Sequence, residues 1–309
     1  MDPIRGLEAL PAPDGPTVVT VGFFDGVHLG HRAVLGRAVE EARRRGMRSV
    51  AVTFDRHPRE ILAPGREPRL LTTVERKAEL IAATGIDLVV VLEFTEAFSR
   101  WPAERFISEV LVEGLRTEHA VVGADFTFGF KALGTPELLI EAGPTYGFTA
   151  ERVELIHLGE RKVSSSSIRE ALVEGDLTWP QEALGRRFVL DGTVVRGAGR
   201  GTGIGWPTAN LQTLPRLLLP GSGVYAGRVR VPAGGFVSAI NVGTNPTFGV
   251  EPLHVESFLL DFEGNLVGEP MAIEFWARLR DELRFETAEA LSDAIADDVR
   301  RTRELVPPA

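Results

Sequence analysis

The sequence predicts two domains, an α/β domain followed by a smaller β domain with a C-terminal helix. Strand and helix patterns alternate over the first half, which predicts a doubly wound parallel sheet with helices on both faces. Short alternating runs separated by glycine and proline turns fill the second half and predict an antiparallel barrel or sandwich. With 309 residues, the chain is long enough for two separate cores. We expect the domains to cover residues 1–183 and 184–309.

The first half should begin with a buried strand at Val18–Val21, because all four residues are β-branched. Apolar residues at helical spacing then predict a helix over Val34–Ala42. Further strands are expected at 48–54, 87–94, 119–123 and 152–158, and further helices at 74–84, from Pro102 to Leu111, at 136–142 and at 168–173. Ligands of such sheets bind beyond the carboxyl ends of the strands. The strand-end turns that contain Asp25, Asp55 and Asp125 should therefore converge on one crevice.

The second half contains five runs that are typical of strands and one long helical pattern. The strands are expected at 188–195, 223–231, 236–242, 255–262 and 271–279, and the helix at 288–305. No long helical pattern separates these strands, which favours antiparallel pairing.

The composition excludes several classes of protein. A hydrophobic content of 44% and a charged content of 25% are those of a soluble globular protein, and a net charge of −9 argues against nucleic-acid binding. The absence of cysteine excludes disulfides and thiolate chemistry and fits a reducing cytosol. The N-terminus lacks the apolar run of a signal peptide, and the strongest apolar run, 88–92, is too short to span a bilayer. We expect a cytoplasmic protein that acts on small molecules without nucleic acid or membrane, and a homo-oligomer is left open.

The stretch from Gly22 to His31 joins the first strand to the first helix. A glycine turn before a helix N-terminus favours bound anions, because unpaired backbone N–H groups and the helix dipole face the ligand. His28 and His31 are three residues apart, so both rings could reach one phosphate. The same residues would also suit a capped helix start with surface histidines. Asp25 with the two histidines could bind a metal, although no further ligand follows at suitable spacing.

The whole string G-F-F-D-G-V-H-L-G-H resembles the signature of nucleotidyltransferases, and specifically that of the bacterial bifunctional riboflavin kinase/FAD synthetase family. The resemblance implies that His28 and His31 contact ATP phosphates. It also places the surrounding residues Gly22, Phe23, Phe24, Asp25 and Gly30 in the ATP site.

Two later segments extend the resemblance through the first domain. Gly123–Gly129 contains Asp125, and the segment 161–169 is similar to the family motif S-S-T-x-I-R, with Ser166 in place of threonine. These serines would also suit a simple helix cap. The resemblance implies that polyphosphate donors are provided by Arg161, Lys162, Ser165, Ser166 and Arg169.

One departure lies after the second strand, where the family commonly has D-P-H-P and this chain has Asp55-Arg56-His57-Pro58. The resemblance implies that Asp55 and His57 lie near the flavin. Whether Arg56 assists there or is only solvated is left open.

The first candidate binding segment of the second half is a glycine-rich stretch that ends in Pro207-Thr208-Ala209-Asn210. Glycines let a backbone wrap around an anion, although the glycines alone would equally suit a flexible loop. Proline fixes a hydroxyl and an amide two residues apart, and their oxygens suit Mg²⁺ or phosphate. The string resembles the riboflavin kinase signature, which implies that Thr208 and Asn210 hold Mg²⁺–ATP. The resemblance also implies that the ATP site includes Gly199, Gly201 and Gly203.

Glu256 lies in an apolar strand pattern, where it could simply alternate outward to solvent. The family resemblance continues through 241–248 and 255–262, and implies that Glu256 is the base for the flavin 5′-hydroxyl. In the following segment, 278–285, it implies that Arg280 and Phe285 lie near the flavin. Val267 departs from the family, which often has tyrosine at that position.

The resemblance implies a complete function for the chain. A six-stranded C-terminal barrel would phosphorylate riboflavin to FMN with ATP, and the N-terminal domain would transfer AMP from ATP to FMN, giving FAD and pyrophosphate. Two alternatives are an enzyme that adenylylates another phosphate ester, with the barrel only a binding module, and a flavin-binding regulator without catalysis.

Overall fold

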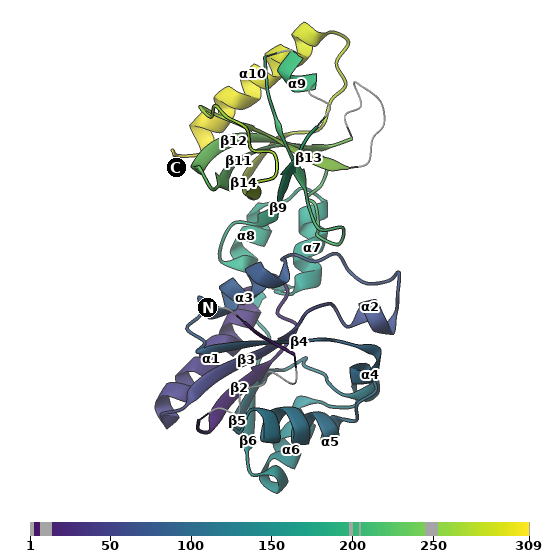
Figure 1. Ribbon diagram of the computed structural model, residues 1–309, viewed down its shortest axis with the longest axis vertical. Coiled ribbons are helices and arrows are strands. Elements are labelled where there is room, and N and C mark those ends of the chain that lie inside the picture. The colour runs from purple at the N-terminus through teal and green to yellow at the C-terminus, as the bar shows by residue number, and fades with distance from the viewer. Residues whose placement is uncertain (1–2, 7–13, 198–199, 204, 245–252, 309) are drawn as a thin grey trace. The chain divides into compact units, whose positions relative to one another are not determined.

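The computed structural model describes residues 3–6, 14–197, 200–203, 205–244 and 253–308. They form two compact units (Figure 1). The first contains residues up to 69 together with 74–165, and the second contains 70–73 together with everything from 166. Among the described residues, no helix has both the length and the apolar character needed to cross a membrane.

The first unit is built on a six-stranded sheet in which every pair of neighbouring strands is parallel. The strand order is β1-β4-β3-β2-β5-β6. The strands are β1 (Ile4–Arg5), β2 (Thr17–Val21), β3 (Arg48–Phe54), β4 (Leu88–Leu92), β5 (Thr117–Gly123) and β6 (Thr149–Val153). This confirms the doubly wound parallel sheet.

Alternate residues of the strands form cores on opposite faces of this sheet. Val19 and Val21 pack with η1 (Phe106–Gly114) and α6 (Pro136–Tyr146), whereas Val18 packs with α1 (Leu29–Arg45) and α3 (Val74–Ala82). Both faces are therefore covered, which explains the nearly continuous β-branched runs. The helical segments are α1 (Leu29–Arg45), α2 (Arg59–Leu62), α3 (Val74–Ala82), α4 (Glu96–Ser99), α5 (Ala103–Arg105), the π-helix η1 (Phe106–Gly114), the 3₁₀ turn η2 (Phe130–Ala132) and α6 (Pro136–Tyr146).

The last predicted strand of this half, 152–158, is wrong in its position. The strand β6 already begins at Thr149, directly after the buried Phe148, and ends at Val153. Residues 157 and 158 instead form β7 (His157–Leu158), which pairs with β8 (Arg161–Lys162) in a separate hairpin. The mixed polarity of β6, which lies at the edge of the sheet, gives little periodic signal.

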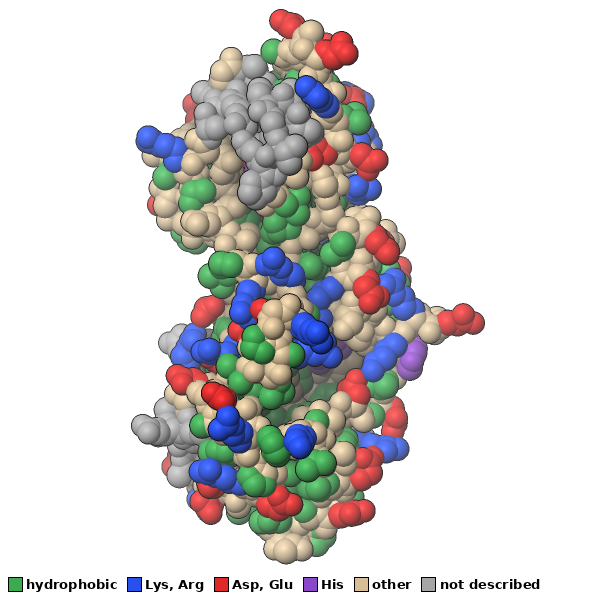
Figure 2. All heavy atoms as spheres, turned by 90° about the vertical axis from the view of Figure 1, so that its right-hand side faces the viewer, with side chains coloured by type: hydrophobic (Ala, Val, Ile, Leu, Met, Phe, Trp, Pro, Cys, Tyr) green, Lys and Arg blue, Asp and Glu red, His purple; other side chains and the backbone are tan. Residues whose placement is uncertain are grey.

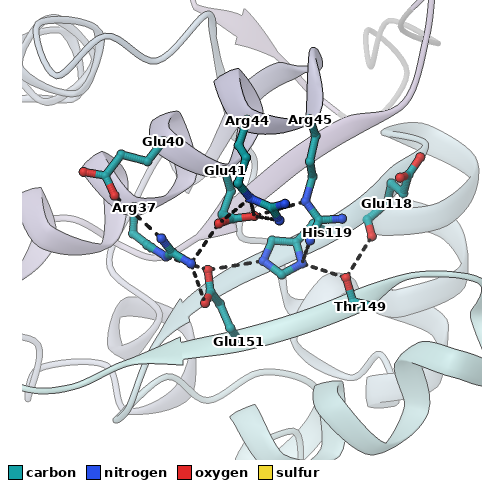
Figure 3. Close-up of polar contacts among 9 residues, drawn as sticks. All are labelled: Arg37, Glu40, Glu41, Arg44, Arg45, Glu118, His119, Thr149 and Glu151. Carbon is teal, nitrogen blue, oxygen red and sulfur yellow. Dashed lines mark hydrogen bonds and ion pairs between the residues drawn. The ribbon is translucent and has the colours of Figure 1, made fainter.

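A polar network joins α1 to β5 and β6 (Figure 3). Glu41 is buried among Arg37, Arg44 and Arg45, and its hydrogen bonds with Arg44 are the main reason that its pKa falls to about 2. Arg45 Nη2 lies 3.2 Å from His119 Nδ1, and His119 Nε2 lies 3.3 Å from Glu151. Because Arg45 can only donate, the proton of the neutral imidazole lies on Nε2 and points to Glu151. Burial lowers the pKa of His119.

The second unit contains a closed antiparallel barrel with the strand order β10-β13-β12-β11-β14-β9. The strands are β9 (Val189–Val195), β10 (Ala209–Gln212), β11 (Gly223–Val231), β12 (Gly234–Gly243), β13 (His254–Leu259) and β14 (Pro270–Arg280). The barrel prediction is confirmed, and β10 is a strand that the sequence pattern did not mark. The helices are α7 (Ser165–Val173), α8 (Thr178–Leu184), α9 (Arg200–Gly203) and α10 (Ala288–Leu305), of which α10 packs on β11, β12 and β14.

A short segment from the first half of the sequence completes the second unit. Leu70 N–H donates to Arg216 O at 2.7 Å, and Leu218 N–H donates to Leu70 O at 2.8 Å. The neighbouring Leu71 is buried. The compact second unit therefore includes α7, α8 and residues 70–73, in addition to the segment expected from residue 184.

Candidate active sites

The first candidate site lies where the order of the parallel sheet reverses. β3 and β4 follow on one side of β2, and β5 and β6 follow on the other, so the direction of chain order changes at β2. Ligands of doubly wound sheets bind at the carboxyl ends of the strands at such a point. The turn that starts at Gly22 leaves β2 there, and Asp125 follows β5.

The turn after β2 has a strained backbone held in place by burial. Phe24 and Val27 have φ values of 54° and 40°, and both side chains are buried. Positive φ is costly for such residues, about 1–3 kcal/mol each, and persists only where packing fixes it. Gly22 permits this packing, because a Cβ there would lie 2.8 Å from the Phe24 ring.

The two histidines form a stacked pair at the start of α1. His28 is the N-cap, and its Nδ1 accepts a hydrogen bond from the His31 N–H at 3.3 Å. The ring centroids are 3.6 Å apart, and His31 makes a T-shaped contact with Phe24. His28 is only 6% exposed, so the interpretation as surface histidines is wrong for this residue, whereas the cap is confirmed. In the neutral ring of His28, the accepting Nδ1 leaves the proton on Nε2.

Strand-end residues from neighbouring elements contact this turn. Ser165 Oγ donates to Asp25 O at 2.9 Å, and Thr53 Oγ1 donates to Phe23 O at 2.9 Å. The Phe23 ring makes an edge contact with His57, with centroids 4.8 Å apart. The turns after β2 and β3 and the start of α7 are thus joined around Asp25.

The other predicted residues of this site lie after β5 and on β8, α1 and α7. Asp125 forms an ion pair of 2.8 Å with Lys162 on β8, next to Arg161. Ser166 and Arg169 lie on α7 in the second unit and Gly30 lies on α1. The described residues contain no group of three His, Cys, Asp or Glu side chains arranged to hold a metal ion.

Arg56 forms an ion pair with the carboxylate that precedes it. Its Nη2 lies 2.8 Å from Asp55 Oδ2, and Asp55 Oδ1 accepts the Phe94 N–H at 2.9 Å. The hydrogen bond to Asp55 raises the pKa of Arg56. The cation at this departure from the family pattern therefore partly neutralises Asp55.

The second candidate site lies in the barrel around Glu256. Thr208 Oγ1 donates to Glu256 Oε2 at 2.9 Å, and His254 Nε2 lies 3.2 Å from Oε1. Glu256 on β13 pairs in register with Asn210 on β10 and with Asn241 on β12. Its side chain is 22% exposed. Each carboxylate oxygen has a polar neighbour, so Glu256 is not simply directed to solvent.

The glycine-rich stretch before this site is anchored through Trp206. The Trp206 backbone N–H donates to Gly201 O at 2.8 Å, and its indole N–H donates to Ser292 on α10 at 3.0 Å. A Cβ on Gly201 would collide with the Trp206 carbonyl, so this close approach requires glycine. Gly203 ends α9, and Gly199 lies outside the described residues.

Arg280, expected near the flavin, is held by a buried carboxylate. Its Nε and Nη2 reach Asp298 on α10 at 3.1 and 2.7 Å, and its guanidinium lies 5.6 Å from the Phe285 ring centroid. Val267, a further departure from the family pattern, is exposed.

Sequence reasoning missed three side chains that contact these residues: Lys77, His254 and Asp298. Lys77 has a detectable signal, because it lies one position before Ala78 and four before Ile81, on the buried face of α3. His254 precedes Glu256 by two residues and so shares its face of β13. Asp298 lies on a helix that carries several other charged side chains, so no local pattern distinguishes it.

The chain matches the models of two transferase families, one in each half. Residues 10–167 match the FAD synthetase family model, and residues 184–306 match the riboflavin kinase model. The chain is 37% identical to the bifunctional riboflavin kinase/FMN adenylyltransferase of Pseudomonas fluorescens over 310 residues, covering 100% of this chain and 99% of the relative. The Escherichia coli K12 protein of the same name is 36% identical, covering 97% and 96%.

A solved structure also matches along the whole chain. It is reported as a macrolide-efflux protein from Streptococcus pneumoniae, with a TM-score of 0.86 and 28% identity, covering 99% of both chains.

The chain belongs to the bifunctional riboflavin kinase/FMN adenylyltransferase family. Its N-terminal domain is the FMN adenylyltransferase, and its C-terminal domain is the riboflavin kinase. ATP, riboflavin, FMN and FAD are its substrates and products. Neither alternative, another adenylylated ester or a regulator without catalysis, agrees with this family.

Proposed function

We propose that His28 and His31 stabilise the phosphates during adenylyl transfer. An FMN phosphate oxygen attacks the α-phosphorus of ATP, the bond to the bridging oxygen breaks, and pyrophosphate leaves. Negative charge grows on the leaving group, and preorganised donors that face it lower the barrier. The observation that carries this proposal is the stacked histidine pair at the N-terminus of α1, where backbone N–H groups also favour anions.

The remaining residues of the first site bind the two substrates in this proposal. Asp55 and His57 are placed beside the flavin, supported by the contact of His57 with Phe23. The ATP site comprises Gly22, Phe23, Phe24, Asp25, Gly30, Asp125, Arg161, Ser165, Ser166 and Arg169. The hydrogen bond from Ser165 to Asp25 O supports a common site for the turn and the start of α7.

In the barrel, Glu256 accepts the proton of the riboflavin 5′-hydroxyl. The hydroxyl oxygen attacks the γ-phosphorus of ATP, and ADP leaves. Thr208 donates to one Glu256 oxygen and so orients the carboxylate. The ATP site includes Gly199, Gly201 and Gly203, with Thr208 and Asn210 nearest the phosphates.

Mg²⁺ fits this second site. The Thr208 hydroxyl uses its proton on Glu256, so its oxygen lone pairs remain available for a hard cation. Asn210, which pairs in register with Glu256, adds an amide oxygen. When bound, Mg²⁺ would neutralise phosphate charge during phosphoryl transfer.

The proposed domains run over 1–183 and 184–309, which the start of the riboflavin kinase match at residue 184 supports. Residues 168–183, with most of α7 and α8, lie between the two matched segments. Dependence of both reactions on ATP supports a cytoplasmic location. On the face drawn in Figure 2, positive and negative side chains are interspersed, which supports small-molecule substrates rather than nucleic acid.

The test is to incubate the enzyme with riboflavin and Mg²⁺–ATP and to separate the flavins. His31→Ala should accumulate FMN without FAD, because only the first site is damaged. Glu256→Gln and Asn210→Ala should fail to make FMN yet convert supplied FMN to FAD. Each variant thus contains its own control for folding. FAD formation by His31→Ala at the wild-type rate would refute the role of the histidine pair.

A further inference from the structure

Lys77 is a buried cation that the reaction as described above does not use. It lies on α3, and its side chain is only 2% exposed. Lysine is almost never fully buried unless its charge has partners. The surroundings of Lys77 should therefore show what its ammonium group does.

The ammonium group contacts the ends of two neighbouring strands. Nζ donates to the carbonyl of Phe54, the last residue of β3, at 2.8 Å. It also lies 4.1 Å from the ring centroid of Phe23, in the turn after β2. A cation over an aromatic face is attracted by the ring, and more strongly where water is excluded. One charge thus connects the turn that leads to the histidines with the turn that carries Asp55.

Two carboxylates act on this charge, one from each turn. Asp25 is 2% exposed and follows β2, whereas Asp55 follows β3. Burial lowers the pKa of Lys77 to about 8, and the charges of Asp25 and Asp55 oppose that effect. Lys77 is therefore mostly protonated at neutral pH.

We propose that Lys77, in its protonated form, is a positioning residue for FMN adenylylation. It holds the Phe23 turn against the end of β3 and compensates Asp25 and Asp55 where the phosphates of FMN and ATP must enter. Without this cation, two carboxylates would face incoming polyphosphate with less compensation, and the Phe23 ring would lose a contact that fixes it beside His57. The inference rests on the proposed location of the adenylylation site.

The experiment measures FAD formation from supplied FMN and Mg²⁺–ATP in the full chain, from about pH 6.5 to about pH 9.5. Lys77→Met removes the charge and keeps a similar shape, whereas Lys77→Arg keeps the charge throughout this range. Arg76→Met is the matched control, because it removes a cation from the adjacent position of the same helix. Riboflavin kinase activity of each sample reports the second unit.

We expect kcat/KM of Lys77→Met for adenylylation to fall by about tenfold or more at pH 7, with Arg76→Met within about twofold of wild type. Wild-type kcat/KM should decline above about pH 8 relative to Lys77→Arg, because only lysine loses its proton there. A purely structural role would not produce this difference between pH profiles.

Two results would overturn the proposal: Lys77→Met within about twofold of wild type, or the same alkaline decline in wild type and Lys77→Arg. Where Lys77→Met loses both activities through unfolding, the pH profile of Lys77→Arg decides. His31→Ala is measured alongside, so wild-type activity of that variant would refute the histidine role without changing what the Lys77 variants show.

Discussion

Replacing Asp298 by alanine should lower the free energy of unfolding of the second unit. The loss should be much larger than the net stability that the Asp298–Arg280 ion pair contributes. Asp298 is 3% exposed and accepts from Arg280 at 3.1, 3.1 and 2.7 Å. Burial nevertheless raises the pKa of Asp298, so desolvation outweighs the attraction of Arg280. Removing only the carboxylate leaves a largely buried guanidinium without its partner, which costs about 3–5 kcal/mol. Replacing both residues, as Asp298→Leu with Arg280→Met, should recover all but about 1–2 kcal/mol.

Scanning calorimetry of the full chain tests this prediction. For a unit of this size, about 3–5 kcal/mol corresponds to a loss of roughly 10 °C in Tm. The transition of the second unit is identified in wild type by the temperature at which riboflavin kinase activity is lost. Adenylyltransferase activity should be lost at an unchanged temperature in Asp298→Ala. Equal destabilisation of the single and double variants would refute the reasoning, as would a shift of less than about 2 °C in Asp298→Ala.

Three further predictions concern the two sites and the network in Figure 3. Because burial lowers the pKa of His119, the unfolded chain binds its proton at a higher pH than the folded protein does. Stability should therefore fall as pH drops below about 6.5, and His119→Gln should flatten the urea midpoints measured across that range. Gly22→Ala places a Cβ 2.8 Å from the Phe24 ring and should lower the FAD-forming rate by about tenfold or more while FMN formation continues. Thr208→Val loses the hydrogen bond to Glu256 and should reduce riboflavin phosphorylation by about tenfold or more, whereas Thr208→Ser should retain most of it; equal rates for the valine and serine variants would contradict this role.

The central strands of the first unit were predictable because both faces of the sheet are buried. The run Val18–Val21 has no exposed face, so its composition alone marks a strand. Edge strands lack this constraint, and β6 was misplaced because Thr149 and Glu151 face a polar network instead of a core. The strand β10 was not predicted because it begins within the Pro-Thr-Ala-Asn motif and only one of its four residues, Leu211, is buried.

The candidate sites were predictable in their motifs but not in their supporting contacts. Gly22 to His31 and Thr208 to Asn210 are local strings, and their assignment to substrate sites stays a prediction that rests on the resemblance. Lys77 contacts Phe54, which is 23 residues away in the sequence, and the sequence around Lys77 does not predict this contact. The same holds for Arg56: the sequence showed a cation, and only the fold shows its ion pair with Asp55.

The segment 70–73 has a consequence for dividing this enzyme into its two activities. Because it belongs to the second unit while 69 and 74 belong to the first, the backbone passes between the units three times. A fragment that begins at residue 166 or 184 lacks Leu70, and with it the hydrogen-bonding partners of Arg216 O and Leu218 N–H. Such a fragment also lacks Leu71, whose side chain is buried. An isolated kinase fragment should therefore be stabilised by adding a synthetic peptide that spans 70–73, as in fragment complementation.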